Sequence, residues 1–347
     1  MKRNVGRPWD IEVTEDFEPE VSILIPAHNE EANIEPKLEN IRNVYYPMEK
    51  MEIIVVDDAS EDNTVNNVER FRLRHPDLNI KLLKQNPRAG KAAALNKALQ
   101  LSTKPIVIVS DADTRWPQDI LKKAMPYLAD ARVGAVTGRG VNVNAGESWV
   151  TEAEESYLQL ANFVRFAESK IHSTIRFEGG FCAYKRNAFD MFDCETGSDD
   201  SGTALKVVLN GYRSIMLPNV VFYTSFPTAL SAKFKTKVRR ANQLIGLWIK
   251  CLRLMFSRNL SLPKRIAIPE ILLFLFNPAA FLVLSASSMA LIVFQPLSPL
   301  SLLIIFSVLG FLILLRQAFI ELLIDNFILV SSLVTFLLGR RYVHWGR

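Results

Sequence analysis

Glu52-Ile-Ile-Val-Val-Asp-Asp-Ala-Ser60 joins a run of four apolar residues to two adjacent carboxylates. The apolar run predicts a buried strand, with the carboxylates at its carboxyl end. The pattern recurs at Val21-Ser-Ile-Leu-Ile-Pro26 and at Pro105-Ile-Val-Ile-Val-Ser-Asp-Ala-Asp113, and a weaker strand is predicted at Ile80-Lys-Leu-Leu83. Because helix-like stretches separate these strands, we expect an α/β fold with a mostly parallel sheet and right-handed crossovers.

Composition and motif content exclude several classes of protein. Hydrophobic residues make up 49% of the 347 residues, which excludes disorder. Three scattered cysteines exclude a disulfide scaffold, and four isolated histidines argue against a histidine zinc centre. No GxGxxG or GxxxxGK[ST] motif follows a predicted strand, so hydride transfer and P-loop hydrolysis are disfavoured.

Composition also divides the chain into segments. We expect a polar segment over 1–20 without the features of a signal peptide, and a catalytic domain over 21–228. Residues 229–269 carry ten cations and no acid, interleaved with apolar residues, which is typical of amphipathic helices on an anionic membrane. Nucleic-acid binding is the competing interpretation and is disfavoured, because the almost entirely apolar region 270–338 follows. A basic, cytosolic tail is expected over 339–347.

The apolar region predicts an integral membrane protein with its catalytic domain in the cytosol. Spans are expected at about 271–294 and 300–316, joined by a proline-rich turn. A third helix at about 318–338 carries Glu321 and Asp325, so it either crosses the membrane or lies in the interface. Cations on both sides of the region favour an even number of crossings, and hence a hairpin with a third, non-crossing helix.

Polar clusters follow three of the predicted strands, at the strand ends where parallel sheets bind ligands. The clusters are Pro26-Ala-His-Asn-Glu30, Asp57-Asp-Ala-Ser60 and Asp111-Ala-Asp113. The second cluster also fits a helix cap, and the third is a short pattern that chance can produce. Two carboxylates at a strand end nevertheless suit Mg²⁺ or Mn²⁺, which would also bind the oxygens of a diphosphate.

Three further positions have both a structural and a chemical interpretation. Lys91 begins a predicted helix, either as a solvated lysine or as a phosphate contact. Gly179 and Gly180 form either a turn or a place where a substrate approaches the backbone. Asp199 and Asp200 begin another helix, where they either stabilise its N-terminus or supply a general base for an attacking hydroxyl.

The ordered motifs, together with Gly90-Lys-Ala-Ala-Ala-Leu-Asn96 and Ser198-Asp-Asp200, resemble glycosyltransferase family 2 over about residues 20–215. The resemblance implies the GT-A fold, and the C-terminal helices with Trp345-Gly-Arg347 are similar to the membrane branch of cellulose, chitin and hyaluronan synthases. It implies metal-dependent, inverting transfer of a hexose or N-acetylhexosamine from a nucleotide-diphosphate donor, with a UDP-sugar expected. The other partners implied are the lipid bilayer and a lipid-linked or carbohydrate acceptor at the cytosolic membrane face, with no nucleic acid.

The resemblance also assigns roles to the residues that match its motifs. The residues implied in donor binding are Pro26, Ala27, Asn29, Glu30, Asp57, Asp58, Lys91, Asp111 and Ala112. Among these, Asp57, with Asp58, would hydrogen-bond the base, and Lys91 would contact the phosphates. Asp113, with Asp111, would bind Mn²⁺ or Mg²⁺.

The remaining roles concern the acceptor. Asp200, with Asp199, would be the base of a single in-line displacement. Residues expected on the acceptor side are Gly179, Gly180, Arg239 and Arg240.

Two features depart from the polymer synthases. Their Gln-x-x-Arg-Trp motif is replaced by Thr236-Lys-Val-Arg-Arg240, which lacks the tryptophan face on which a sugar stacks. Membrane helices before the catalytic domain are also not expected.

A lipid-linked or glycolipid acceptor is therefore favoured over synthesis and extrusion of a polysaccharide chain. The alternatives are a processive synthase, a polyprenyl-phosphate transferase that uses GDP-mannose or UDP-glucose, and a catalytically dead nucleotide-sugar-binding scaffold.

Overall fold

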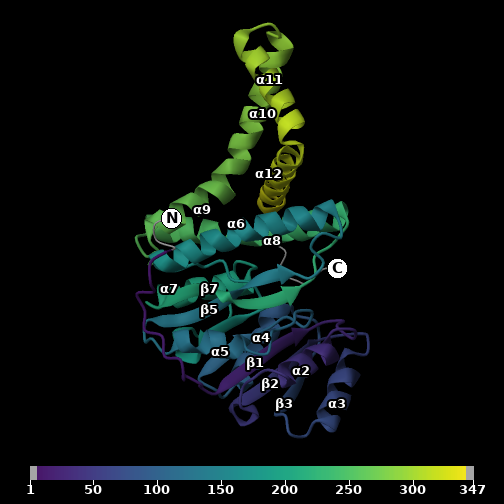
Figure 1. Ribbon diagram of the computed structural model, residues 1–347, viewed down its shortest axis with the longest axis vertical. Coiled ribbons are helices and arrows are strands. Elements are labelled where there is room, and N and C mark those ends of the chain that lie inside the picture. Colours follow the sequence, from purple (N-terminus) through teal and green to yellow (C-terminus); the bar gives the residue numbers. More distant parts are fainter. Residues whose placement is uncertain (1–5, 341–347) are drawn as a thin grey trace. The chain divides into compact units, whose positions relative to one another are not determined.

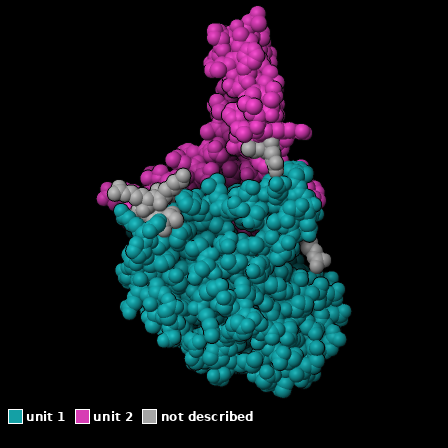
Figure 2. Space-filling view, viewed as in Figure 1, with its two compact units in different colours: residues 1–228, 259–263, 343–347 teal, residues 229–258, 264–342 magenta. Residues whose placement is uncertain are grey.

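The computed structural model describes residues 6–340, apart from the side chains of Gln317 and Ala318. The chain divides into two compact units, which Figure 2 distinguishes by colour. Among the described residues, unit 1 comprises 6–228 together with Asn259–Pro263, and unit 2 comprises Ala229–Arg258 and 264–340. Of the predicted tail at 339–347, the structure describes Gly339 and Arg340, so Trp345-Gly-Arg347 lies outside the described residues.

Unit 1 is built on one seven-stranded sheet (Figure 1). Its strands are β1 (Val21–Ala27), β2 (Met51–Asp58), β3 (Ile80–Gln85), β4 (Ile106–Val109), β5 (Val133–Asn142), β6 (Cys182–Lys185) and β7 (Arg213–Thr224). In the order β3-β2-β1-β4-β6-β5-β7, all neighbours are parallel except β6, which runs antiparallel to β4 and β5. Every residue of β1 and β2 is buried, as their apolar runs predict. The mostly parallel α/β fold is therefore confirmed.

The connections between strands carry the helices of unit 1. These are α2 (Ile34–Arg42), α3 (Thr64–Arg74), α4 (Lys91–Leu101), α5 (Ile120–Ala124), α6 (Trp149–Ile171) and α7 (Asp199–Leu209), with short 3₁₀ turns at Met48–Lys50, Met125–Leu128 and Arg186–Ala188. The sequence motifs do not predict α6, β5 or β7. The reason is clearest in β5, where three glycines and two register irregularities interrupt the alternation of side chains.

The topology explains why the predicted site residues lie at one edge of the sheet. β1, β2 and β4 are parallel neighbours, so their carboxyl ends lie at the same edge. β6 runs in the opposite direction and begins at this edge, where Cys182 pairs with Val109. Gly179 and Gly180 precede β6, and Asp111 follows β4. Residues about 70 positions apart in the sequence are therefore neighbours in space.

Unit 2 is rich in apolar residues and consists of helices. The helices are α8 (Leu230–Phe256), α9 (Lys264–Ile271), the π-helical turn η4 (Leu272–Phe276), α10 (Asn277–Phe294), α11 (Pro299–Leu314) and α12 (Arg316–Leu337). By length and composition, Lys264–Phe294 and Phe319–Leu337 are long and apolar enough to cross a membrane, whereas α11 is shorter. The helix bounds differ from the expected spans: the first continuous helix begins at Lys264, and the chain leaves helical geometry at Leu315, which separates α11 from α12.

Polar contacts fix α12 alongside α8 within unit 2. Lys233 Nζ lies 2.9 Å from Glu321 Oε2, and Lys237 Nζ lies 3.4 Å from Asp325 Oδ1. Farther along both helices, polar contacts continue among Asn242, Ser332 and Thr335. Because the residue numbers of the partners rise together, the two helices run parallel. Both acids of α12 are therefore paired with cations of α8.

We predict that Glu52→Gln destabilises unit 1 by about 2 kcal/mol at pH 7, because it removes a charge-assisted bond to Lys81. Glu52 is 1% exposed and accepts hydrogen bonds from Lys81 Nζ and Thr103 N, both at 2.7 Å, and from Ser22 Oγ. Burial favours the protonated acid, but these donors outweigh burial and lower the pKa of Glu52 to about 2.

A folded-state pKa below that of the unfolded chain gives stability that is present above about pH 4.5. This stability is lost as the pH falls toward 2. The unfolding temperatures of wild type and the variant should therefore differ at pH 7 and converge in acid, whereas Glu49→Gln at an exposed position should have no effect. A difference that persists at pH 2 would contradict the assignment.

Candidate active site

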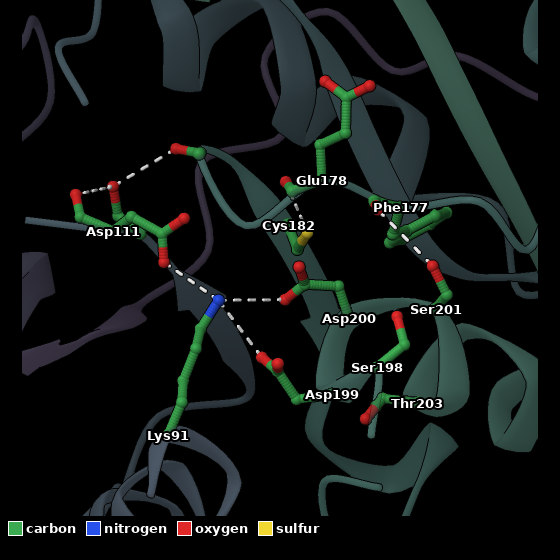
Figure 3. A network of polar contacts seen from close by, with 12 residues as sticks. Lys91, Asp111, Phe177, Glu178, Cys182, Ser198, Asp199, Asp200, Ser201 and Thr203 are labelled. Atoms are coloured by element: carbon green, nitrogen blue, oxygen red, sulfur yellow. Dashed lines mark hydrogen bonds and ion pairs between the residues drawn. The ribbon is translucent and has the colours of Figure 1, made fainter. Parts of the chain in front are cut away.

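Lys91 lies at the centre of a cluster of carboxylates (Figure 3). Its Nζ lies 2.9 Å from Asp111 Oδ1, 3.2 Å from Asp199 Oδ2 and 3.5 Å from Asp200 Oδ1. Burial opposes the charge of this lysine, but the three carboxylates outweigh burial and hold the pKa of Lys91 well above its usual range. Residues for which the sequence predicts separate roles are thus joined by one ammonium group.

The loop before α4 places Lys91 in the cluster. Gly90 has a φ of 90°, a conformation that residues with a Cβ rarely adopt. The buried Asp58 accepts hydrogen bonds from Gln85 Nε2 (2.6 Å), Ala89 N (2.7 Å) and Gly90 N (2.8 Å). Both carboxylate oxygens of Asp58 are engaged with this loop, and its expected contact with a base stays a prediction.

Asp57, in contrast, keeps one oxygen for a ligand. Its Oδ2 accepts a hydrogen bond from Ser60 N at 3.2 Å. Its Oδ1 is buried and has no hydrogen-bond partner among the described residues. Because buried acceptors are nearly always satisfied, this oxygen is suited to an N–H group of a bound molecule.

The predicted nucleoside loop lies beside Asp57. Pro26 and Ala27 end β1, and Ala27 pairs with Asp57 across the sheet. Asn29 N and Glu30 N then donate to hydroxyl groups of the segment after β2, at 2.9 and 2.8 Å. The loops after β1 and β2 are therefore bound together at the edge where the polar clusters meet.

Asp111 and Asp113 occupy the turn after β4, with the buried Ala112 between them. Asp111 N donates to Gly179 O at 3.0 Å, which ties the turn to the segment before β6. The Asp113 side chain reaches solvent, but the surrounding protein removes part of its hydration and Asp111 repels its charge. Both effects raise the pKa of Asp113.

Asp199 and Asp200 occupy the first turn of α7, as the sequence predicts. Loss of hydration, followed by repulsion from Asp199, raises the pKa of Asp200 well above its usual range, and the positive charge of Lys91 opposes this shift. A carboxylate with a raised pKa is a stronger base than an ordinary aspartate. This property suits a group that removes a proton from a hydroxyl.

The charge of the cluster fits a divalent cation. The four carboxylates of Asp111, Asp113, Asp199 and Asp200 face one lysine, which leaves three negative charges at full ionisation. No group of three or more His, Cys, Asp or Glu side chains forms a metal cage between residues 6 and 340. Mg²⁺ and Mn²⁺ need only one or two carboxylates, because phosphate oxygens and water complete their shell.

The space around Gly179 and Gly180 leaves no room for a Cβ atom. A Cβ on Gly179 would lie 2.6 Å from both Asp111 Oδ2 and Lys91 Nζ, and a Cβ on Gly180 would lie 2.2 Å from the ring of Phe222. The backbone of Gly179 therefore forms a wall of the cluster, whereas Gly180 packs against the sheet.

The sequence motifs miss two charged residues behind this wall. Arg165 of α6 is 2% exposed, and its Nη1 lies 2.6 Å from Glu178 Oε1. The other oxygen of Glu178 accepts a hydrogen bond from Gly140 N at 3.3 Å. No motif surrounds Arg165, so the sequence contains no signal for this pair. Arg239 and Arg240 lie on α8 in unit 2, and their acceptor-side role stays a prediction.

Comparison with known proteins identifies the family of the chain. The family profile for glycosyl transferase family 2 matches residues 22–192. The mannosyltransferase PcManGT from Pyrobaculum calidifontis, solved in complex with GDP-Man and Mn²⁺, shares 32% sequence identity with this chain. The two structures superpose with a TM-score of 0.83. The alignment covers 98% of this chain and 93% of that protein. The chain belongs to glycosyltransferase family 2. This family 2 protein also has the expected GT-A fold.

Two curated relatives give the range of the similarity. The probable glycosyltransferase YdaM of Bacillus subtilis (strain 168) is 31% identical over 244 residues, which are 66% of this chain and 56% of YdaM. A beta-monoglucosyldiacylglycerol synthase of Synechocystis sp. (strain ATCC 27184 / PCC 6803 / Kazusa) is 28% identical over 208 residues, which are 58% of this chain and 43% of that synthase. The chain thus spans about half the length of these curated relatives.

We predict different effects for alanine at the two glycines. Gly179→Ala should weaken nucleotide binding by about tenfold or more with little loss of stability, because its Cβ meets the movable ends of Asp111 and Lys91. Gly180→Ala should lower stability by about 1–3 kcal/mol, because its Cβ meets a packed ring. Calorimetric nucleotide titration and thermal unfolding of both variants separate the two effects. Equal effects of the two substitutions on both quantities would contradict this distinction.

Proposed function

We propose that this family 2 glycosyltransferase is a membrane-bound, metal-dependent, inverting enzyme that transfers a hexose from a nucleotide-diphosphate donor to a lipid-linked acceptor. The observation that carries the proposal is the cluster of Asp111, Asp199 and Asp200 around Lys91. Its excess of negative charge suits a divalent cation, and its raised-pKa carboxylate suits a base.

The donor proposed first is GDP-mannose. The Oδ1 of Asp57, which has no partner among the described residues, is suited to accept from an N–H group. Both uracil and guanine present such a group, so this oxygen suits either base. The resemblance to the polymer synthases favours UDP. The similarity to the mannosyltransferase solved with GDP-Man and Mn²⁺ favours GDP, and it extends over 98% of the chain. Because that similarity extends over nearly the whole chain, GDP is favoured over UDP.

In the proposed reaction, each residue acts at one stage. Asp57 binds the base, and Lys91 exchanges carboxylate partners for the diphosphate, whose charge grows as the glycosidic bond breaks. Asp113 and Asp111 would hold Mn²⁺ or Mg²⁺, which would supply Lewis-acid neutralisation of the phosphate charge. Asp200, oriented beside Asp199, removes the proton from the attacking acceptor oxygen, which reaches the anomeric carbon from the face opposite the leaving group.

Unit 2 supports a membrane location and a lipid-linked acceptor. Helix α10 exposes large apolar side chains such as Val283, Leu284 and Met289, each at least two-thirds exposed. Such a surface is suited to lipid. The acids of α12 are paired with lysines of α8, which favours α12 as an interfacial helix beside a hairpin of α10 and α11. The tryptophan on which a polymer would stack is absent from 236–240.

We predict that Asp113→Asn abolishes metal-dependent nucleotide binding. Detergent-purified wild type should bind GDP more tightly in Mn²⁺ than in EDTA, as measured by calorimetry, and UDP provides the comparison. Asp77→Asn is the matched control, because Asp77 is exposed and outside the cluster. Metal-dependent binding that survives in Asp113→Asn would contradict the assigned metal ligand, and no binding of either nucleotide by wild type would favour a dead relative.

We predict that Asp200→Asn keeps donor binding but lowers transfer by about 10²–10⁴-fold, because it removes the general base. In wild type, transfer should fall as the pH drops through the raised pKa of Asp200, since the base must be ionised. The measurement is transfer of labelled mannose from GDP-mannose to a lipid acceptor with a free hydroxyl group, because the oxygen of a polyprenyl phosphate is already ionised and needs no base. Elongation of a polysaccharide by the pure protein would instead establish a processive synthase, and full activity of the variant would exclude Asp200 as the base.

A further inference from the structure

Lys37 of α2 is a buried lysine in unit 1 that no motif explains. Its side chain is fully buried. Its Nζ donates to Thr114 O at 3.1 Å, lies 3.5 Å from Thr114 Oγ1, and lies 4.2 Å from the ring centroid of Trp116. None of the ion pairs found in residues 6–340 involves Lys37. Burying an ammonium group without a carboxylate is costly, so a methionine of similar length would pack here with less penalty.

The contacts of Lys37 hold the segment that follows the predicted metal ligands. Thr114 Oγ1, which Lys37 approaches, also donates to Asp111 O at 2.9 Å and so closes the turn that contains Asp113. The negative charges of Asp111 and Asp113 reach the lysine, although burial and the nearby Arg115 lower the pKa of Lys37 well below its usual range. Lys37 therefore lies behind the turn, while Lys91 contacts Asp111 directly.

Asn40, one helical turn after Lys37, binds the same segment. Its Nδ2 donates to Trp116 O at 2.8 Å, and its Oδ1 accepts from Trp116 N at 2.7 Å. Trp116 in turn donates from Nε1 to Gly180 O at 2.7 Å. The i and i+3 positions of α2 thus fix the backbone on the C-terminal side of the turn.

The same helix is attached to the nucleoside loop. Asn33 N and Ile34 N, at the start of α2, both donate to Glu30 O at 2.9 Å. Helix α2 therefore connects the loop after β1 with the turn after β4. A rigid connection of this kind keeps the base-binding and metal-binding parts of a donor site at a fixed separation.

We propose that Lys37, together with Asn40, is a positioning residue that holds the Asp111–Asp113 turn in the shape that binds the metal–nucleotide complex. The inference rests on the proposed function. Partners that orient metal ligands from behind typically change metal affinity by about 10–100-fold when they are removed. Lys37 and Asn40 make such contacts through Thr114 and Trp116, and neither touches the carboxylates themselves.

The test compares Lys37→Met and Asn40→Leu, which keep side-chain length or shape, with Lys97→Met at an exposed position of α4. GDP and UDP are titrated by calorimetry in Mn²⁺ and in EDTA, and amide hydrogen exchange is measured over residues 110–116. We expect both variants to weaken Mn²⁺-dependent binding by about tenfold or more, with metal-free binding within about twofold and faster exchange in the turn. Lys97→Met should bind nucleotide and unfold like wild type.

Several results would overturn the inference. Wild-type Mn²⁺-dependent affinity in both variants would show that the turn holds its shape without them. An equal loss of metal-free and metal-dependent binding, or failure of both variants to fold, would show a general structural role. Metal-dependent binding that Asp113→Asn removes but Lys37→Met preserves would refute this inference and leave the proposed function intact. Wild type without metal-dependent binding would overturn both.

Discussion

One ammonium group, Lys91 Nζ, holds together carboxylates that come from two distant parts of the chain. Asp111 follows β4 and Asp199 and Asp200 begin α7, so without this lysine the strand end and the helix start would repel each other. The rest of the local structure places that one atom. Gly90 supplies the backbone conformation, and the parallel sheet brings its loop to the edge where the acids lie.

The cluster is supported by a second layer of buried charged side chains that bind backbone rather than ligand. Asp58 accepts from the amides of the loop before Lys91, and Arg165 donates from Nη2 to Gly138 O at 3.0 Å while pairing with Glu178. Lys37 does the same behind the turn after β4. Groups that touch substrate can be held accurately only if their own supports are rigid, and buried charge–backbone contacts provide that rigidity.

The sequence predicts the strands with continuous apolar runs and the carboxylates that follow them, because burial and strand ends leave local patterns. It cannot predict β5, where glycines break the alternation, or the role of Arg165, whose partner Glu178 lies 13 residues later in the segment before β6. Asp58 directly follows Asp57 at the end of β2. Its adjacent position to Asp57 suggests a shared role, but the side chains of neighbouring strand residues point to opposite faces, and only Asp57 keeps an oxygen without a partner.

The parallel pairing of α8 with α12 leaves the tip of the apolar hairpin free to change in length. Lys233 and Lys237 fix α12 at a constant offset, and the aromatic contacts of α12 reach α10 at Phe281 and α11 at Phe311. Between Phe281 and Phe311, equal numbers of residues could be inserted into, or deleted from, α10 and α11 without shifting the register of α12 against α8. The tip formed by α10 and α11 can therefore vary in length while the lysine contacts that hold α12 against α8 stay in place.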